Sequence, residues 1–447
     1  MSDAVMVTGL GVVSPIGLDV ESFARSLRAG EVGVEELPVE GGRGEQGLLA
    51  PLRGFDFEAA LAAVPGLGRP LREQIHRVGR RGALPIQAGL AAVAQAWSDA
   101  RLEENPVPGH RIGVIVGGNN LTGNYAFRHH DTYQREPMYL PARYALDVKD
   151  TNHVATISEA FGVTGEGYTV GASMASGNAA IIHAARLVQC GAVDVCLAVG
   201  AMAQMDPQER AAFDKLGLLA DAGDGPDDGG AAPDGESRGT NGANGTNGAK
   251  GADNGALNVP RPFDRDRSGF APGEATACLV LESRRTARRR RTRPLVELAG
   301  YAQGLDANSQ ADPDPAGETR VMSTALAGAG LAGDRVDYVN AHATATPAGD
   351  AAELSALYRV LEGHRPWINS TKSMVGHTLT AAGAIEAVAT VVQMTHGFVH
   401  PNPTLLTPVD ERFRLVGRRA VETSITCALS NSFSFGGFNS SLVMIRE

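Results

Sequence analysis

The chain of 447 residues contains only four cysteines, and none of them forms a Cys-x-x-Cys pair or a spacing typical of metal ligands. We therefore expect no metal site, and the scattered cysteines are typical of small buried residues in a reducing compartment. No uninterrupted apolar run is long enough to cross a membrane. The N-terminal residues also lack the basic and apolar segments of a signal peptide. The sequence predicts a cytoplasmic protein that does not contact a membrane.

An excess of positive charge is also missing. The formal net charge is −10, which argues against a general nucleic-acid binder. With 43% hydrophobic and 20% charged residues, the composition is that of an ordinary globular protein. A chain of this length can bury a large core and is expected to form two or three domains.

Apolar and β-branched runs bounded by Gly and Pro predict strands that are buried on both faces. These runs occupy residues 4–13, 111–117, 193–200, 276–282, 336–341 and 441–445. Ala-rich segments at residues 84–100 and 179–189 predict helices between the strands. The alternation favours an α/β fold with largely parallel sheets.

Two segments differ from the rest in composition. Residues 221–258 consist mainly of Gly, Asp, Asn, Ala and Ser and cannot bury enough apolar surface to offset their ordering, so we expect a flexible surface insertion. Residues 284–293 contain seven arginines. A solvated connection is the default interpretation of such a run, and docking of an acidic partner is the alternative.

Four motifs are chemically informative when taken together with residues 7–17, Val-Thr-Gly-Leu-Gly-Val-Val-Ser-Pro-Ile-Gly. Residues 171–177 read Gly-Ala-Ser-Met-Ala-Ser-Gly, and residues 340–350 read Asn-Ala-His-Ala-Thr-Ala-Thr-Pro-Ala-Gly-Asp. Residues 372–377 read Lys-Ser-Met-Val-Gly-His, and residues 431–439 read Asn-Ser-Phe-Ser-Phe-Gly-Gly-Phe-Asn. In this order, the five segments resemble the β-ketoacyl-acyl carrier protein synthases of the thiolase superfamily.

The resemblance implies a thiolase fold, with two similar α/β halves in an α-β-α-β-α layered arrangement. We expect the N-terminal half to span residues 1–260, including the insertion, and the C-terminal half to span residues 261–447. Relatives form dimers, so a homodimer is the default expectation, with a heterodimer containing another ketosynthase as the alternative.

The family's nucleophilic cysteine falls on Met174. A thioether has no proton to lose and cannot carry an acyl group as a thiolate does. A shift of one residue would instead place Ser173 in the nucleophile position. That shift breaks the spacing to Ser176, Gly177 and His183, so it is the weaker alternative.

The same resemblance assigns roles to the other motifs. His342 and His377 would donate N–H groups to an enolate oxygen, and Lys372 completes the catalytic set. Glu386 and Glu353 would position these residues without contacting the substrate themselves. Further implied roles are pantetheine binding by Thr344 and Thr346, and an oxyanion hole or gate formed by the backbone N–H groups of Met174 and Phe435.

Substrate access gives less specific signals. Asn120 falls where chain-elongating relatives line the acyl pocket with an aliphatic residue, so a polar group there would suit a two- or three-carbon unit. Capping of a turn explains an asparagine equally well. Arg77, Arg80 and Arg81 match a basic region that relatives use to dock the acidic carrier protein, although solvated arginines are a fair alternative.

These features predict a malonyl-acyl carrier protein decarboxylase that makes acetyl-carrier protein in a polyketide, antibiotic-type pathway. No cofactor is expected beyond the phosphopantetheine of the acyl carrier protein that holds the substrate. A chain-length-factor-like partner of an active ketosynthase, without catalysis of its own, is one alternative. An acyltransferase or condensing enzyme that uses Ser173 is the other.

Overall fold

Eleven strands form one continuous mixed sheet within residues 3–39, 46–220 and 259–446, the part of the chain that the computed structural model describes. The predicted insertion at residues 221–258 lies outside the described residues. No helix in the described part is both long and apolar enough to cross a bilayer.

The sheet consists of two groups of five strands with the same topology. From the junction outward, the first group contains β1 (Val5–Val13), β7 (Thr276–Ser283), β6 (Val195–Gly200), β4 (Ile112–Gly117) and β5 (Gly167–Val170). The second group contains β8 (Val296–Leu305), β15 (Phe438–Ile445), β14 (Cys427–Ser434), β9 (Tyr338–Asn340) and β10 (Trp367–Asn369), with the short β12 (Arg414–Leu415) at its edge. In each group, the first strand along the chain lies at the junction and pairs with the last. The predicted pair of similar α/β halves is therefore present.

The pairing also shows where the chain passes from one group to the other. β7 pairs with β1 and β6 of the first group, and β8 is the first strand of the second. The passage therefore lies between Ser283 and Val296. The boundary after residue 260 stays a prediction about separable domains.

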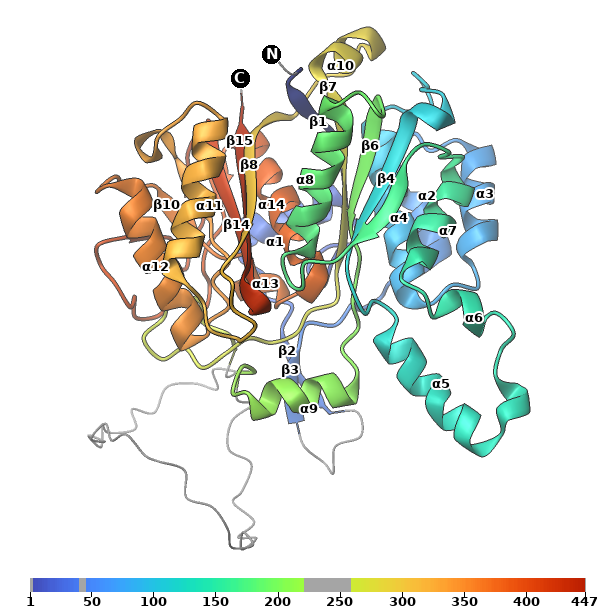
Figure 1. Cartoon of the computed structure of the whole chain (residues 1–447), viewed down its shortest axis with the longest axis horizontal. Helices are drawn as coiled ribbons and strands as arrows, with labels where there is room; N and C mark the ends of the chain where they lie inside the picture. Colours follow the sequence, from blue (N-terminus) through green and yellow to red (C-terminus); the bar gives the residue numbers. More distant parts are fainter. Residues whose placement is uncertain (1–2, 40–45, 221–258, 447) are drawn as a thin grey trace, which may run out of the picture.

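Helices cover both outer faces of the two strand groups and fill the space between them (Figure 1). The middle layer holds α8 (Ser176–Gln189) and α14 (Ala382–His396), which contact strands of both groups. On the outside, α4 (Leu84–Asp99) and α7 (Thr151–Phe161) pack on the first group, and α11 (Pro315–Gly328) packs on the second beside α12 (Pro347–Leu361). This is the α-β-α-β-α order that the sequence predicts.

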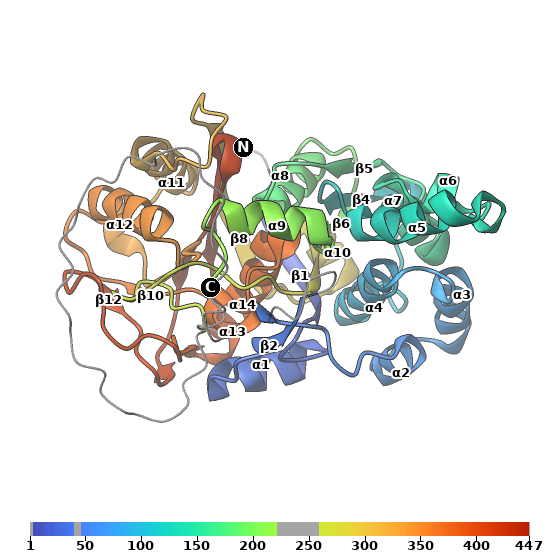
Figure 2. The ribbon, with the colours of Figure 1, turned by 90° about the horizontal axis from the view of Figure 1, so that it is seen from below.

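The remaining elements lie around these layers (Figure 2). The helices are α1 (Val20–Ala29), α2 (Phe57–Ala63), α3 (Arg69–Gly79), α5 (Gly123–Arg135), α6 (Tyr144–Asp147), α9 (Pro207–Lys215), α10 (Arg284–Arg290) and α13 (Lys372–Val375). Two-stranded pairs are formed by β2 (Glu35–Pro38) with β3 (Gln46–Leu49) and by β11 (Phe398–Val399) with β13 (Val421–Glu422).

Sequence patterns explain the central layers. All nine residues of β1 are buried, as expected for a strand covered on both faces. Gly9 and Gly11 in this strand allow α4 to approach closely, because a Cβ at Gly11 would lie 1.8 Å from the carbonyl oxygen of Ala92. In α14, every residue from Ala382 to Met394 is buried, which fits a helix enclosed between two layers.

The expectation of largely parallel sheets is wrong. Antiparallel pairs include β1 with β7, β6 with β7, β8 with β15, and β14 with β15. Parallel pairing holds for the outer strands, such as β4 with β5 and β9 with β10. Helices bury both faces of parallel and antiparallel strands alike here, so the apolar runs could not distinguish the two directions.

The arginine run is only in part the predicted solvated connection. It forms α10, and the side chain of Arg290 is buried, with 5% of the residue exposed. Its Nη1 lies 2.5 Å from Oε1 of Glu282, and its Nε donates to the carbonyl oxygen of Asn105 at 3.0 Å. The hydroxyl of Thr8 donates to the same Glu282 oxygen at 2.7 Å. Arg290 therefore ties α10 to the end of β7.

Substitution of Arg290 tests this buried ion pair. Arg290→Ala leaves the Glu282 carboxylate buried without its cation, and we expect a loss of about 3–5 kcal/mol in unfolding free energy. Arg289→Ala on the same helix is the matched control, since the Arg289 side chain is 57% exposed and pairs with Asp194 at the surface. Its expected cost is below about 1 kcal/mol. Urea unfolding measures both, and equal losses would contradict the assignment.

Candidate active site

The turn between β5 and α8 directs Met174 into the protein. Ser173 adopts a left-handed conformation with φ of 50°. The hydroxyl of Ser176 accepts the N–H of Ala172 at 2.9 Å and donates to the carbonyl oxygen of Ser173 at 2.6 Å, which closes the turn. Gly177 then lies against α14, where an added Cβ would be 2.5 Å from the backbone nitrogen of Ala384. This close helix contact fixes the position of residue 174.

Met174 faces one of the two predicted imidazoles. Its Sδ lies 3.1 Å from Nε2 of His377, and the residue is 5% exposed. Ser173 is only half-buried and does not line the cavity that Met174 borders. The structure therefore places Met174, and not Ser173, at the cavity beside His377, and the assignment of Met174 to the nucleophile position stays a prediction.

The backbone N–H of Met174 is already engaged. It donates to the hydroxyl of Ser434 at 2.9 Å, and the hydroxyl of Ser432 donates to the carbonyl oxygen of Met174 at 3.3 Å. Ser434 stands where the family pattern has a glycine, immediately before Phe435. The predicted oxyanion hole of Met174 and Phe435 thus has one of its two N–H groups occupied by a side chain of the same protein.

His342 follows β9 and is held by two buried residues. Nζ of Lys372 lies 3.2 Å from Nδ1 of His342 and donates to the His342 carbonyl oxygen at 2.6 Å. The His342 backbone N–H donates to Oε1 of Glu353 at 3.0 Å. Because an ammonium group can only donate, Nδ1 of His342 must accept, and the ring proton is on Nε2.

His377 has the same tautomer for a different reason. The backbone N–H of Leu379 donates to Nδ1 of His377 at 3.2 Å, so the proton is again on Nε2. The two rings are edge to face, with centroids 5.7 Å apart. Burial is the main cause that holds the pKa of both imidazoles well below 6.5, and the Lys372 charge adds to it. At neutral pH, both residues are neutral N–H donors.

The two glutamates with predicted supporting roles lie beside His342 and Lys372. Glu386 forms a buried ion pair with Lys372, and burial raises the pKa of its carboxyl to about 7 against the lowering effect of that lysine. Glu353 accepts the N–H of Ala343 at 2.8 Å in addition to that of His342. Its pKa is raised, mainly by burial. Glu353 therefore positions the backbone of His342, and Glu386 positions Lys372.

A largely apolar cavity of about 330 Å³ opens in front of these residues. Its lining includes Met174, His342, Thr344, Thr346, Phe270, Phe433, Phe435 and Glu318. The hydroxyls of Thr344 and Thr346 are 2.9 Å apart, so both predicted pantetheine contacts lie in one wall. His377 is fully buried behind Met174 and Phe270.

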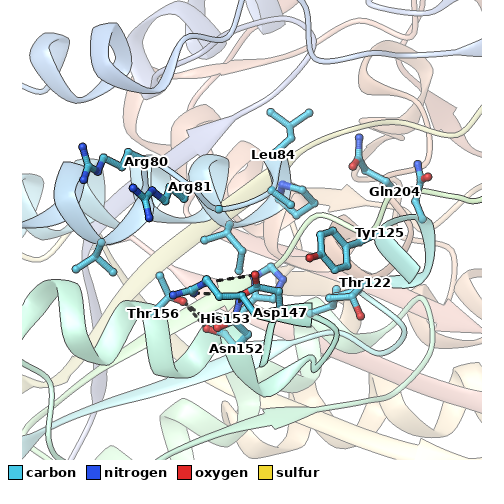
Figure 3. A pocket seen from close by; sticks show the side chains of 18 of the residues that line it. Arg80, Arg81, Leu84, Thr122, Tyr125, Asp147, Asn152, His153, Thr156 and Gln204 are labelled. Atoms are coloured by element: carbon cyan, nitrogen blue, oxygen red, sulfur yellow. Dashed lines mark hydrogen bonds and ion pairs between the residues drawn. The ribbon is translucent and has the colours of Figure 1, made fainter. Parts of the chain in front are cut away.

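The predicted carrier-docking arginines lie at a separate cavity of about 460 Å³ (Figure 3). Arg77, Arg80 and Arg81 line it from the end of α3 and the following connection. In Figure 3, Arg80 and Arg81 lie together on the side opposite Tyr125 and Gln204. The structure brings these three arginines together but not to the Met174 cavity, and their docking role stays a prediction.

The structure does not bring Asn120 to the Met174 cavity. The residue is exposed, has φ of 55° and accepts the N–H of Gly123 at 3.2 Å. Its own N–H donates to Oδ2 of Asp150 at 2.9 Å. These contacts are those of a turn, the alternative that the sequence left open.

Sequence reasoning missed two groups in this site. Ser434 was visible as a departure from the family's glycine, but its contact with Met174 joins residues 260 positions apart. Glu318 follows an ordinary Pro-Ala-Gly helix start, and no local pattern distinguishes it from a first-turn glutamate at a surface.

Comparisons with known proteins agree with this geometry. Residues 2–287 match the model of the β-ketoacyl synthase N-terminal domain, and residues 295–405 match that of the C-terminal domain. The chain belongs to the β-ketoacyl synthase family. It is 33% identical over 438 residues to the polyketide biosynthesis malonyl-ACP decarboxylase PksF of Bacillus subtilis, covering 98% of this chain and 95% of the relative.

The chain is also similar to proteins that are named as synthases. The chain is 31% identical over 459 residues to 3-oxoacyl-[acyl-carrier-protein] synthase 2 of Vibrio cholerae, covering 99% of each. Among solved structures, AntDE:AntF is a type II PKS acyl-carrier protein in complex with its ketosynthase bound to the hexaketide. It superposes with a TM-score of 0.79 at 25% identity, covering 100% of both chains. The thiolase-type fold of the family is therefore shown for this chain.

A buried histidine beside the arginine cavity gives a pH test of stability. Burial lowers the pKa of His153 from 6.5 to about 4, and its Nε2 has no hydrogen-bond partner among the described residues. Below pH 6.5, the unfolded chain therefore binds a proton at His153 that the folded chain does not bind. The contribution of neutral His153 to the free energy of unfolding is fully present above pH 6.5 and is lost as the pH falls toward 4.

We expect His153 to account for about 2 kcal/mol of the stability lost between pH 7.5 and pH 5. His153→Gln should remove that share, so its unfolding free energy should fall less over the same interval. Urea unfolding at both pH values measures the difference, and the exposed His110→Gln is the control. An identical pH dependence in His153→Gln and the unsubstituted protein would contradict the prediction.

Proposed function

We propose that this chain decarboxylates a malonyl group carried on an acyl carrier protein and releases the acetyl-carrier protein without condensation, as a step of polyketide biosynthesis. The similarity to PksF supports this assignment. The proposal rests mainly on residue 174. A methionine sulfur occupies the expected place of the nucleophile, while both imidazole Nε2–H donors remain.

The retained groups match the needs of decarboxylation. Loss of carbon dioxide from a malonyl thioester places negative charge on the thioester oxygen, and preorganised neutral donors stabilise that charge. His342 presents its Nε2–H to the cavity, and His377 presents its own to Sδ of Met174. Sulfur is a weak acceptor on a flexible side chain, so a thioester oxygen can displace it.

The missing groups are those of acyl transfer. Condensation needs a thiolate to hold the acyl chain and an oxyanion hole for the tetrahedral intermediate. Met174 cannot supply the first, and Ser434 occupies the Met174 N–H that would contribute to the second. Met174 and Ser434 are far apart in the sequence, and both thus remove groups that acyl transfer requires.

The remaining assignments follow from the proposed reaction. The pantetheine arm would contact Thr344 and Thr346, and the carrier protein would dock near Arg77, Arg80 and Arg81. A protein with both histidine motifs intact is better suited to catalysis than to a purely structural role beside another ketosynthase. A homodimer remains the expected assembly.

Replacement of either imidazole tests the charge-stabilising pair. His342→Ala and His377→Ala should each lower the rate of acetyl-carrier protein formation by about 10²–10³-fold, because each removes one donor to the enolate oxygen. Intact mass spectrometry of malonyl-carrier protein measures the rate. His110→Ala, which alters an exposed histidine, should keep full activity. Unchanged turnover in both site variants would refute the mechanism.

A restored thiol tests the identity of the nucleophile position. Met174→Cys places a thiol just before the N-terminus of α8, where the helix dipole favours the thiolate. We expect it to retain an acyl group from an acyl-carrier protein, whereas the natural protein retains none. Ser173→Cys is the matched control, and peptide mass mapping locates the adduct. Acylation of residue 173 in place of residue 174 would reverse the assignment.

A further inference from the structure

Glu318 is a buried carboxyl group in the wall of the Met174 cavity that has no part in the steps above. It lies in the first turn of α11, and 1% of the residue is exposed. Its Oε2 has no hydrogen-bond partner among the described residues. An unpartnered buried polar atom destabilises the fold, so packing alone does not favour a glutamate at this position.

The surroundings of Glu318 keep its proton in place. Burial is the main cause that raises the pKa of this carboxyl to about 10, and nearby Glu353, Asp306 and Asp314 add to the effect. Arg320 in the same helix forms its ion pair with Asp306, at 3.6 Å from Oδ1, and no salt bridge to Glu318 occurs among the described residues. Glu318 is therefore a neutral carboxylic acid at neutral pH.

The other acidic groups at the cavity are hydrogen-bonded to other residues or exposed to solvent. Both carboxylate oxygens of Asp306 accept from Nδ2 of Asn439, at 2.7 and 2.8 Å. Asp312 is exposed to solvent. The ammonium of Lys372 donates to His342 and Glu386 and does not line the cavity. Within the described lining, Glu318 is the buried acid whose proton has no acceptor.

Decarboxylation without condensation creates a need for such a proton. In a condensing enzyme, the enolate carbon attacks an acyl group, whereas here it must gain hydrogen. The imidazoles of His342 and His377 are neutral, and the proposed function uses their Nε2–H groups for the enolate oxygen, after that oxygen displaces Sδ of Met174 from His377. A separate acid must therefore protonate the enolate carbon.

We propose that Glu318 donates the proton that converts the enolate into the acetyl thioester, an inference that rests on the proposed function. The bond between C2 and the malonyl carboxylate breaks, its electron pair passes into the enolate, and carbon dioxide leaves. The O–H bond of Glu318 then breaks as its proton forms a new C–H bond at C2. The Glu318 carboxylate regains a proton from water that enters the cavity. One malonyl carboxylate and one proton thus yield carbon dioxide and an acetyl group.

Glu318→Gln tests this role, since an amide keeps the shape of the side chain without a transferable acidic proton. With malonyl-carrier protein and the full chain, we expect acetyl-carrier protein to form at least about 10²-fold more slowly. The KM should change little, and thermal stability should not fall. Asp312→Asn, a change in the same wall, should leave the rate unaltered. Glu318→Asp retains an acid and should recover part of the activity.

An isotope measurement separates proton donation from a structural role. In an equal mixture of H2O and D2O, the deuterium content of the acetyl product reports on the group that delivers the hydrogen. We expect this content to differ between the natural protein and Glu318→Gln. Equal deuterium content in the two proteins overturns the proposal, whether or not the variant is slower. Absence of acetyl-carrier protein with the natural protein would instead overturn the proposed function, and this inference with it.

Discussion

The buried ammonium group of Lys372 is the interaction on which the site depends. It donates to the ring and the carbonyl oxygen of His342 and forms an ion pair with Glu386. A buried cation is costly unless it is paired and hydrogen-bonded, and Glu386 meets that requirement. Burial is the main cause that lowers the pKa of both imidazoles, and the Lys372 charge adds to it and fixes the tautomer of His342. Lys372 therefore helps both histidines to present neutral N–H groups.

His342 and Met174 are positioned by different elements, so one can change without the other. His342 and Lys372 are held by β9, α13 and α12, whereas Met174 is positioned by the turn before α8. The Met174 sulfur caps His377 and fills space next to it, and Ser434 satisfies the Met174 backbone. The two positions that depart from the family motifs, residues 174 and 434, are thus joined by a hydrogen bond. They leave the charge-stabilising half of the site intact.

Much of the fold could be predicted because burial leaves a direct signature in sequence. The run that forms β1 and the Ala-rich segment of α4 were placed to within one residue at each end. Strand direction leaves no such signature when helices cover both faces. The buried state of Arg290 depends on Glu282 and Asn105, and no local pattern reveals those partners. In the site, ordered motifs identified His342 and His377. Glu318 was missed because its environment comes from Glu353 and Asp306, which are distant in the chain.

In the proposed decarboxylation, the polar groups have two separate tasks. Neutral donors at His342 and His377 stabilise charge on oxygen without surrendering a proton, since a neutral imidazole is a poor acid. An enolate held in this way persists until something reacts at its carbon. In a condensing enzyme, the acyl group on the cysteine is that partner, and Met174 removes it. A neutral acid in the same cavity gives the carbon another partner, so the pKa of Glu318 is as important to the outcome as the absence of a thiol. The fate of the enolate is then decided by which electrophile the cavity offers, a proton or an acyl carbon.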